Sequence, residues 1–205
     1  MIVINFKNYV FGKGAINLAK KIEKANKKAI VAVSSTDIKE ISKKTKLKVY
    51  AQHVDYIAGP KTTGYILAES LKFSGARGTL INHSEHKISF KEIKGTVELC
   101  KKLNLDTVIC IAKLSDVKKI MELKPRAIAY EDPSLISTGK SITKYKNINI
   151  VKFVKLLKNT SIIPLCGAGV SSREDIKEAY ALGCKGALIS SAIARDKKFE
   201  ILNGI

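Results

Sequence analysis

Eight short runs of apolar, mostly β-branched residues recur along the chain. Runs without polar alternation are typical of strands that are buried on both faces of a sheet. The intervening segments carry apolar residues at helical spacing between charged ones, as in residues 90–103, where Ile93, Val97 and Cys100 share one face. We therefore predict strands, each followed by a helical segment, at residues 2–5, 29–33, 47–52, 78–82, 106–112, 126–131, 161–166 and 186–190.

Strict alternation of strands and helices implies a parallel α/β sheet with right-handed crossovers. Eight repeats favour a closed (β/α)8 barrel. A doubly wound open sheet is the alternative, but it usually has fewer strands, and no G-x-G-x-x-G turn follows the first run. No linker or change of composition divides the chain, so we expect residues 1–205 to form a single domain.

The length of 205 residues is short for such a barrel, which typically takes about 250 residues. Helices and loops must therefore be trimmed. After the last predicted strand the chain has room for one modest helix only. The helix predicted at residues 173–183 ends on a glycine, which suits a helix C-cap.

Composition places the chain among globular proteins, with 45% hydrophobic and 27% charged residues. No run of about 18 apolar residues and no signal-peptide pattern is present, so we expect a cytoplasmic protein without a membrane partner. The cysteines lack C-x-x-C spacing and fit reduced core thiols, and the histidines are not spaced with them as zinc ligands, so no metal is expected. The four cysteines are Cys100, Cys110, Cys166 and Cys184.

The formal net charge of +19 raises the question of nucleic-acid binding. The basic residues are nearly all lysines, however, and they are scattered over every helical segment. Base-reading sites favour arginine and aromatic residues. We therefore expect no specific nucleic-acid partner, and a lysine-rich solvated surface that attracts small anions.

Polar residues gather where the predicted strands end, which is where barrels of this class carry function. Asn5 ends the first strand and Lys7 comes just after it, His83 follows the fourth, and Glu131 ends the sixth. Taken singly, Lys7 could be a surface lysine, and Glu131 could be its partner in a buried ion pair. The segments CGAGVSS and SSA follow the seventh and eighth strands, where phosphate commonly binds, and they start at residues 166 and 190.

With these motifs in this order, the chain resembles the triosephosphate isomerase family from residue 4 to about residue 191. The resemblance rests on INFK, YAQHVD, GTLINHSE, AYEDPSLISTG and LCGAGVSS. It implies a TIM barrel that interconverts dihydroxyacetone phosphate and glyceraldehyde 3-phosphate through an enediolate. The alternatives are another phosphate-binding barrel, which the joint presence of Lys7, His83 and Glu131 disfavours, and a non-catalytic phosphate- or RNA-binding relative.

The resemblance assigns roles to five residues. Glu131 is the base, and His83 is a neutral imidazole that donates to the substrate carbonyl and is held neutral by an adjacent helix N-terminus within residues 84–90. Lys7 supplies positive charge beside the developing oxyanion. Asn5 orients the substrate, and Glu85 pairs with Lys7 in the empty site. No metal or organic cofactor is implied, because the substrate's carbonyl takes up the electrons.

The resemblance also implies a phosphate site and a subunit interface. A lid at residues 132–139 closes on phosphate through Ile136 and Ser137, and the remaining contacts are Gly169, Ser190 and Ser191. The chain departs from the family at Asp132, where Pro is usual, and at Ser137, where Gly is usual, so we expect a looser hinge and slower closure. The loop at residues 58–66 matches the segment inserted into a neighbouring subunit, with Thr63 near the partner's site, which implies a homodimer or homotetramer.

Overall fold

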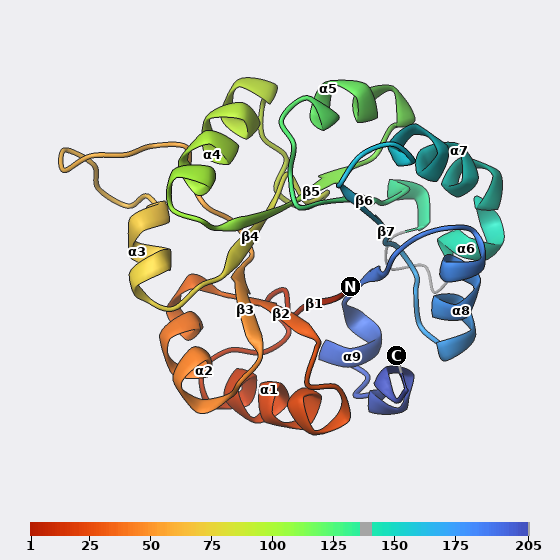
Figure 1. The fold of residues 1–205 in the computed structure, drawn as a ribbon. Coiled ribbons are helices and arrows are strands. Elements are labelled where there is room, and N and C mark those ends of the chain that lie inside the picture. The colour runs from red at the N-terminus through yellow and green to blue at the C-terminus, as the bar shows by residue number, and fades with distance from the viewer. Residues whose placement is uncertain (136–140, 205) are drawn as a thin grey trace.

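A computed structural model describes residues 1–135 and 141–204, and its strands form a closed parallel barrel in sequential order (Figure 1). Every predicted strand is present, with ends within two residues of those predicted. The (β/α)8 barrel expected from the alternating pattern is therefore confirmed. The strands are β1 (Ile2–Asn5), β2 (Ile30–Val33), β3 (Lys48–Ala51), β4 (Gly78–Ile81), β5 (Asp106–Ile111), β6 (Ala127–Tyr130), β7 (Ile163–Cys166) and β8 (Ala187–Ile189).

Parallel pairing around the barrel brings the carboxyl ends of all the strands to one end. β1 pairs with β2 on one side and with β8 on the other, where Ile2 lies opposite Ala187. Closure leaves no unpaired sheet edge.

Helices surround the barrel, and several are as short as the chain length predicts. They are α1 (Lys13–Ala25), α2 (Ile38–Lys44), α3 (Ala68–Phe73), α4 (Phe90–Lys102), α5 (Val117–Met121), α6 (Ile142–Tyr145), α7 (Asn147–Leu157), α8 (Arg173–Ala181) and α9 (Ser191–Ala194). After β8, a single turn of α9 and a 3₁₀ turn, η4 (Phe199–Leu202), stand where we expected one modest helix.

Two hydrophobic layers hold the fold together. One lies between strands and helices, and the other fills the barrel interior with side chains such as Val3, Leu80 and Leu188. Tyr50 is fully buried in the interior, and its hydroxyl donates to Asp106 Oδ2 at 2.6 Å. The four cysteines are buried and form no disulfide. Within the described residues, no helix is long and apolar enough to cross a bilayer.

The loop between β3 and α3 projects away from the barrel, at the left of Figure 1. Asp55 and Ile66 close its base, because the Ile66 N–H donates to Asp55 Oδ2 at 2.7 Å and the Asp55 N–H donates to the Ile66 carbonyl at 3.0 Å. Thr63 near the tip is exposed. The loop that we expected to reach a second subunit is thus held at its base and free of the barrel at its tip.

Candidate active site

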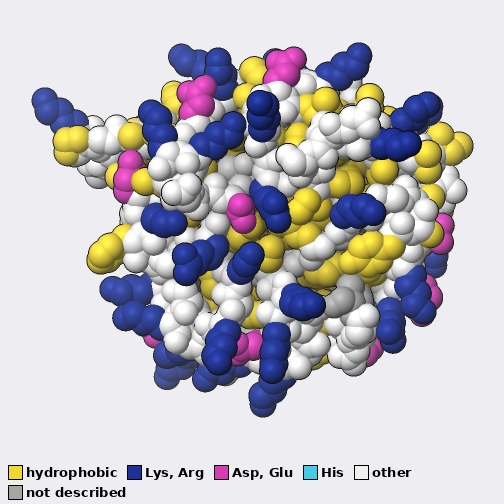
Figure 2. Space-filling model, in the orientation of Figure 1, with side chains coloured by type: hydrophobic (Ala, Val, Ile, Leu, Met, Phe, Trp, Pro, Cys, Tyr) yellow, Lys and Arg dark blue, Asp and Glu magenta, His cyan; other side chains and the backbone are white. Residues whose placement is uncertain are grey.

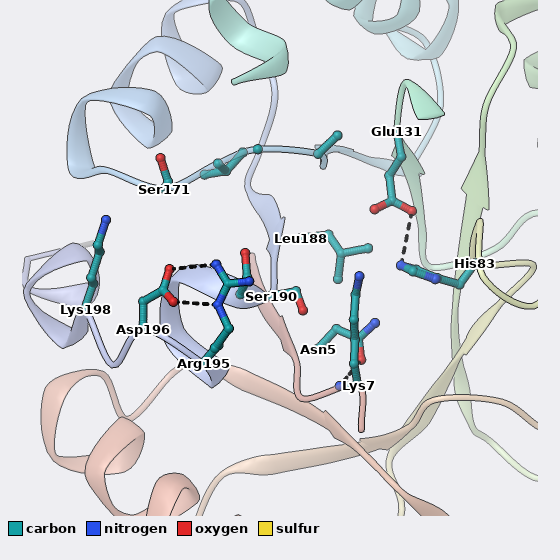
Figure 3. A pocket seen from close by; sticks show the side chains of 14 residues that line it. Asn5, Lys7, His83, Glu131, Ser171, Leu188, Ser190, Arg195, Asp196 and Lys198 are labelled. Atoms are coloured by element: carbon teal, nitrogen blue, oxygen red, sulfur yellow. Dashed lines mark hydrogen bonds and ion pairs between the residues drawn. The ribbon is translucent and has the colours of Figure 1, made fainter. Parts of the chain in front are cut away.

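A cavity of about 280 Å³ opens at the carboxyl ends of the strands (Figure 3). The structure brings together in its lining all the predicted site residues that it describes. Ile136 and Ser137, the predicted lid contacts, lie outside the described residues. The predicted residues that line the cavity are Asn5, Lys7, His83, Glu131, Gly169, Ser190 and Ser191.

Glu131 directly follows β6, and its backbone N–H still donates to Ile111 in β5 at 2.9 Å. The strand pairing therefore fixes where its side chain starts. The side chain is almost fully buried, and its Oε2 has no hydrogen-bond partner among the described residues. A buried carboxylate oxygen without a donor is costly, so this atom is available to a ligand that brings a proton.

His83 faces Glu131 across the cavity, with His83 Nε2 3.7 Å from Glu131 Oε2 (Figure 3). The Glu85 backbone N–H donates to His83 Nδ1 at 3.2 Å. A nitrogen that accepts carries no proton, so the hydrogen bonding assigns a neutral imidazole with its proton on Nε2. The donor lies in a turn, and α4 begins only at Phe90. The hydrogen bond to Nδ1 therefore comes from a turn, and the role expected of the helix N-terminus stays a prediction.

Lys7 is held in a strained position at the end of β1. Its backbone φ is +46°, and its N–H donates to Asn5 Oδ1 at 2.9 Å. Gln52 Nε2 donates to the Lys7 carbonyl at 2.9 Å, so hydrogen bonds hold the backbone on both sides of the Lys7 Cα. The expected pairing with Glu85 is present, with Lys7 Nζ 2.6 Å from Glu85 Oε1. The ammonium therefore has a fixed place at the mouth of the cavity.

Two neighbours of Glu131 went unnoticed in the sequence. A Cβ atom at Gly167 would lie 2.7 Å from Glu131 Cγ and 2.9 Å from its Oε1, so any larger residue would displace the carboxylate. Cys110 lies in β5, and burial, then the charge of Glu131, then a hydrogen bond to Glu131 raise the pKa of its thiol well above its usual value. The register between β5 and β6 brings Cys110 close to Glu131, and this register cannot be read from the sequence.

The loop after β7 forms another wall of the cavity. Ala168 and Gly169 are consecutive residues with positive φ of 70° and 69°. At the start of α8, the N–H groups of Ser171 and Ser172 donate to Asp175 Oδ2 at 2.9 and 3.0 Å. The two N–H groups that directly precede α8 are therefore engaged by Asp175.

The segment after β8 closes the same side of the cavity. Ser190 Oγ is buried and has no hydrogen-bond partner among the described residues. Ser190 precedes α9, whose first N–H groups have no acceptor within the helix. An anion seated here would meet several donors and no carboxylate from these residues.

Three charged residues that the sequence analysis did not select also line this side (Figure 3). Arg195 Nε donates to Asp196 Oδ1 at 2.7 Å, and the guanidinium lies 5.9 Å from the centre of the Tyr9 ring. Lys198 stands beside them. They follow α9, too far beyond the last strand for a search of strand ends to find them.

Asp132, where the family usually has Pro, begins the loop after Glu131. Its Oδ1 accepts from the Ser134 N–H at 3.0 Å and from the Ser134 hydroxyl at 2.6 Å, and its Oδ2 lies 3.5 Å from Lys146 Nζ. Burial opposes ionisation, but the Ser134 hydrogen bonds and the Lys146 charge outweigh it and lower the pKa of Asp132. This carboxylate is engaged away from Glu131.

Among the described residues, no group of three or more His, Cys, Asp and Glu side chains is arranged to hold a metal ion.

Comparison with known proteins gives one consistent family. The sequence model of the triosephosphate isomerase family matches residues 1–204. Curated triosephosphate isomerases from Sulfolobus acidocaldarius and Saccharolobus solfataricus are each 40% identical to the chain, covering 98% of it and 90% and 91% of their own lengths. The Methanocaldococcus jannaschii enzyme is 36% identical and covers 98% of the chain and 95% of itself.

The fold agrees with this sequence likeness. The crystal structure of triosephosphate isomerase from Bartonella henselae superposes with a TM-score of 0.78, covering 98% of this chain and 96% of that one. Because the two sequences are only 18% identical, this similarity supports the barrel fold alone. Because the family model and the archaeal relatives both span nearly the whole sequence, the chain belongs to the triosephosphate isomerase family.

Proposed function

We propose that the protein interconverts dihydroxyacetone phosphate and D-glyceraldehyde 3-phosphate, and that Glu131, His83, Lys7 and Asn5 carry out the reaction. The facing pair of Glu131 and His83 supports this proposal most strongly. A partner-free carboxylate oxygen lies 3.7 Å from an imidazole Nε2 that bears a proton. A base and a neutral hydrogen-bond donor are the two groups that proton transfer beside a carbonyl requires.

In this proposal Glu131 removes the proton from the carbon next to the substrate carbonyl. The electron pair left by that C–H bond forms the enediolate double bond, and the carbonyl oxygen takes up the negative charge. The Nε2–H of His83 donates to this oxygen, and the Lys7 ammonium lies close enough to stabilise the charge. His83 passes its Nε2 proton to this oxygen and takes up the proton of the adjacent hydroxyl, and Glu131 returns its own proton to the neighbouring carbon. The former hydroxyl oxygen thereby becomes the new carbonyl oxygen, which completes the exchange of aldehyde and ketone.

We place the phosphate at the Gly169, Ser190 and Ser191 side of the cavity. The unpartnered Ser190 hydroxyl and the free N–H groups at the start of α9 supply neutral donors there. Ile136 and Ser137 stay predicted contacts from the lid.

The test is a coupled assay for triose phosphate isomerisation with wild type and Glu131→Asp. Shortening the base by one methylene moves it by about 1 Å, and a misplacement of that size can cost about 100-fold. We expect kcat to fall by about that factor with an unchanged melting temperature. Glu122→Asp, an exposed change of the same kind at the C-cap of α5, outside the cavity lining, should leave kcat unchanged. Wild-type protein without isomerase activity, or full activity in Glu131→Asp, would contradict the assignment.

We also infer that the active form is a homo-oligomer, at least a dimer. A second hollow of about 560 Å³ lies on the other side of Lys7, lined also by Gln52, His53 and Glu85. The projecting loop of a second copy would fill it, with Thr63 at the tip. We expect Thr63→Arg to shift the protein toward monomer in sedimentation and to lower activity, whereas Lys61→Arg on the same loop should change neither. A fully active wild-type monomer at assay concentration would refute this inference.

We further infer a cytoplasmic location, in keeping with the buried and unpaired state of all four cysteines. Selective detection in the soluble cytoplasmic fraction of the source cells would test it.

A further inference from the structure

The end of the barrel at which the strands begin, opposite the active-site cavity, carries many basic side chains. Figures 1 and 2 view the protein from this end, and Figure 2 shows more Lys and Arg than Asp and Glu side chains over the face. The isomerase site uses little of the formal charge of +19, so most of this charge has no role in the reaction proposed above.

Three hollows lie in series across this face. Their volumes are about 390, 380 and 480 Å³. The first and the middle hollow share Asp106 and Arg126, and the middle and the last share Lys46 and Lys48. Because neighbouring hollows share walls, they form one continuous band, which we call the basal band.

Cations line the whole basal band. Lys27, Lys28, Lys46, Lys48 and Arg126 surround the middle hollow. Arg77 lines one end of the band, and Lys101 and Lys124 line the other.

The described residues provide no ion-pair partner for these cations. All eight side chains are exposed, and none forms an ion pair with a carboxylate of the described residues. Asp106 is the one carboxylate among the described residues that line the band, and it accepts the Tyr50 hydroxyl. The band therefore has a large excess of uncompensated positive charge.

Helix dipoles account for part of this charge but not for the band. Helix C-termini favour cations within their last turn, which explains Lys24 and the pair Lys43 and Lys44. Lys27 and Lys28 follow the C-cap of α1, and Lys46 and Lys48 follow that of α2. Like charges that converge on one hollow repel each other, and a bound anion would relieve that repulsion.

We propose that the basal band binds a linear polyphosphate chain. A row of hollows with shared cationic walls fits an extended polyanion better than one small anion. The ligand is a chain without bases, because stacking sites for bases need exposed aromatic faces. Tyr50 is the aromatic residue among the described residues that line the band, and it is fully buried. Inorganic polyphosphate has this chemistry, and single-stranded RNA presents the same phosphates with bases attached.

The test measures binding of fluorescently labelled inorganic polyphosphate of defined length by anisotropy, over a series of salt concentrations. The band variant replaces Lys27, Lys28, Lys46 and Lys48 with Gln. The matched control removes the same charge from exposed lysines on the outer helices, by replacing Lys20, Lys21, Lys94 and Lys118 with Gln. Single-stranded RNA with the same number of phosphates forms a parallel arm. Isomerase activity and melting temperature, measured on all three proteins, report on the fold.

Each phosphate neutralised contributes about 0.7 to the slope of log affinity against log salt for a flexible strand. We expect the band variant to reduce that slope by about 3 and to weaken binding at low salt by about tenfold or more. The control should keep most of the slope, RNA should bind more weakly than polyphosphate, and all three proteins should isomerise triose phosphate equally. Equal losses in band variant and control, no polyphosphate binding by wild type at low salt, or tighter binding of RNA would overturn the proposal.

Discussion

Replacing Gly167 with Ala tests the position of the Glu131 carboxylate without altering the carboxylate itself. The new Cβ would stand 2.7 Å from Glu131 Cγ, whereas ordinary contact begins at 3.4 Å. The Glu131 side chain must therefore retreat by about 0.7 Å or more, because the strand backbone on either side is fixed by barrel pairing. The φ of Gly167 is outside the left-handed region, so the alanine backbone is not itself strained.

The size of the effect follows from that displacement. A misplacement of 1 Å can cost about 100-fold in rate, so we expect kcat for triose phosphate to fall by about 10- to 100-fold. KM should change less than about twofold, because the proposed phosphate contacts lie on another side of the cavity. The measurement is steady-state kinetics in the coupled assay, together with the melting temperature of each protein.

Two controls separate displacement from general damage. Gly14→Ala in helix α1, where the atom nearest to the new Cβ is Val10 Cβ at 3.9 Å, should keep wild-type kcat. In a Glu131→Ala background, adding Gly167→Ala should alter the residual rate by less than about twofold, because the group that would be displaced is gone. Wild-type turnover in Gly167→Ala, or an equal loss in the Glu131→Ala background, would refute the reasoning.

Two further predictions concern groups outside the cavity. Tyr50→Phe removes the donor to Asp106 and should lower the free energy of unfolding by about 1 kcal/mol in urea titrations, with kcat/KM unchanged; an unchanged urea midpoint would show that this hydrogen bond adds nothing. Burial raises the pKa of the Cys100 thiol from its ordinary value of 9.0 to about 12, so the thiol stays neutral in the folded protein. The unfolded chain loses this proton above pH 9.0, so the stability that the neutral thiol contributes is complete below pH 9.0 and is lost as the pH rises toward 12. Cys100→Ala should therefore flatten the decline of unfolding free energy between those pH values, and an identical decline in both proteins would contradict the assignment.

The fold was predictable because barrel strands are buried on both faces, which leaves uninterrupted apolar runs in the sequence. The boundaries shifted by up to two residues, as where the exposed Arg126 begins a predicted run but β6 starts at Ala127. The sequence predicted that some helices are short, but it did not predict their bounds. α3 and α5 span six and five residues, which is less than two helical turns and too short to show a clear hydrophobic period.

The site was predictable where residues follow strands directly, because a parallel barrel sends every strand end to the same place. Cys110 and Gly167 were missed because their importance lies in what they touch, a carboxylate on another strand. The tautomer of His83 was expected, but its hydrogen-bond donor depends on the turn that Glu85 adopts, which residue types alone do not specify.

The substitution of the usual Pro by Asp132 shows how a departure from the family can be offset locally. The sequence suggested a looser hinge, since Pro at a compatible site restricts the unfolded and open chain by about 0.4–1 kcal/mol. In the structure Asp132 accepts two hydrogen bonds from Ser134 and lies near Lys146, and a net hydrogen bond contributes about 0.5–1.5 kcal/mol. The free energy that these hydrogen bonds contribute is as large as the free energy that the restricted backbone of Pro would contribute. The first turn of this loop, η3 (Pro133–Leu135), is therefore restrained by side-chain contacts in place of a ring at residue 132.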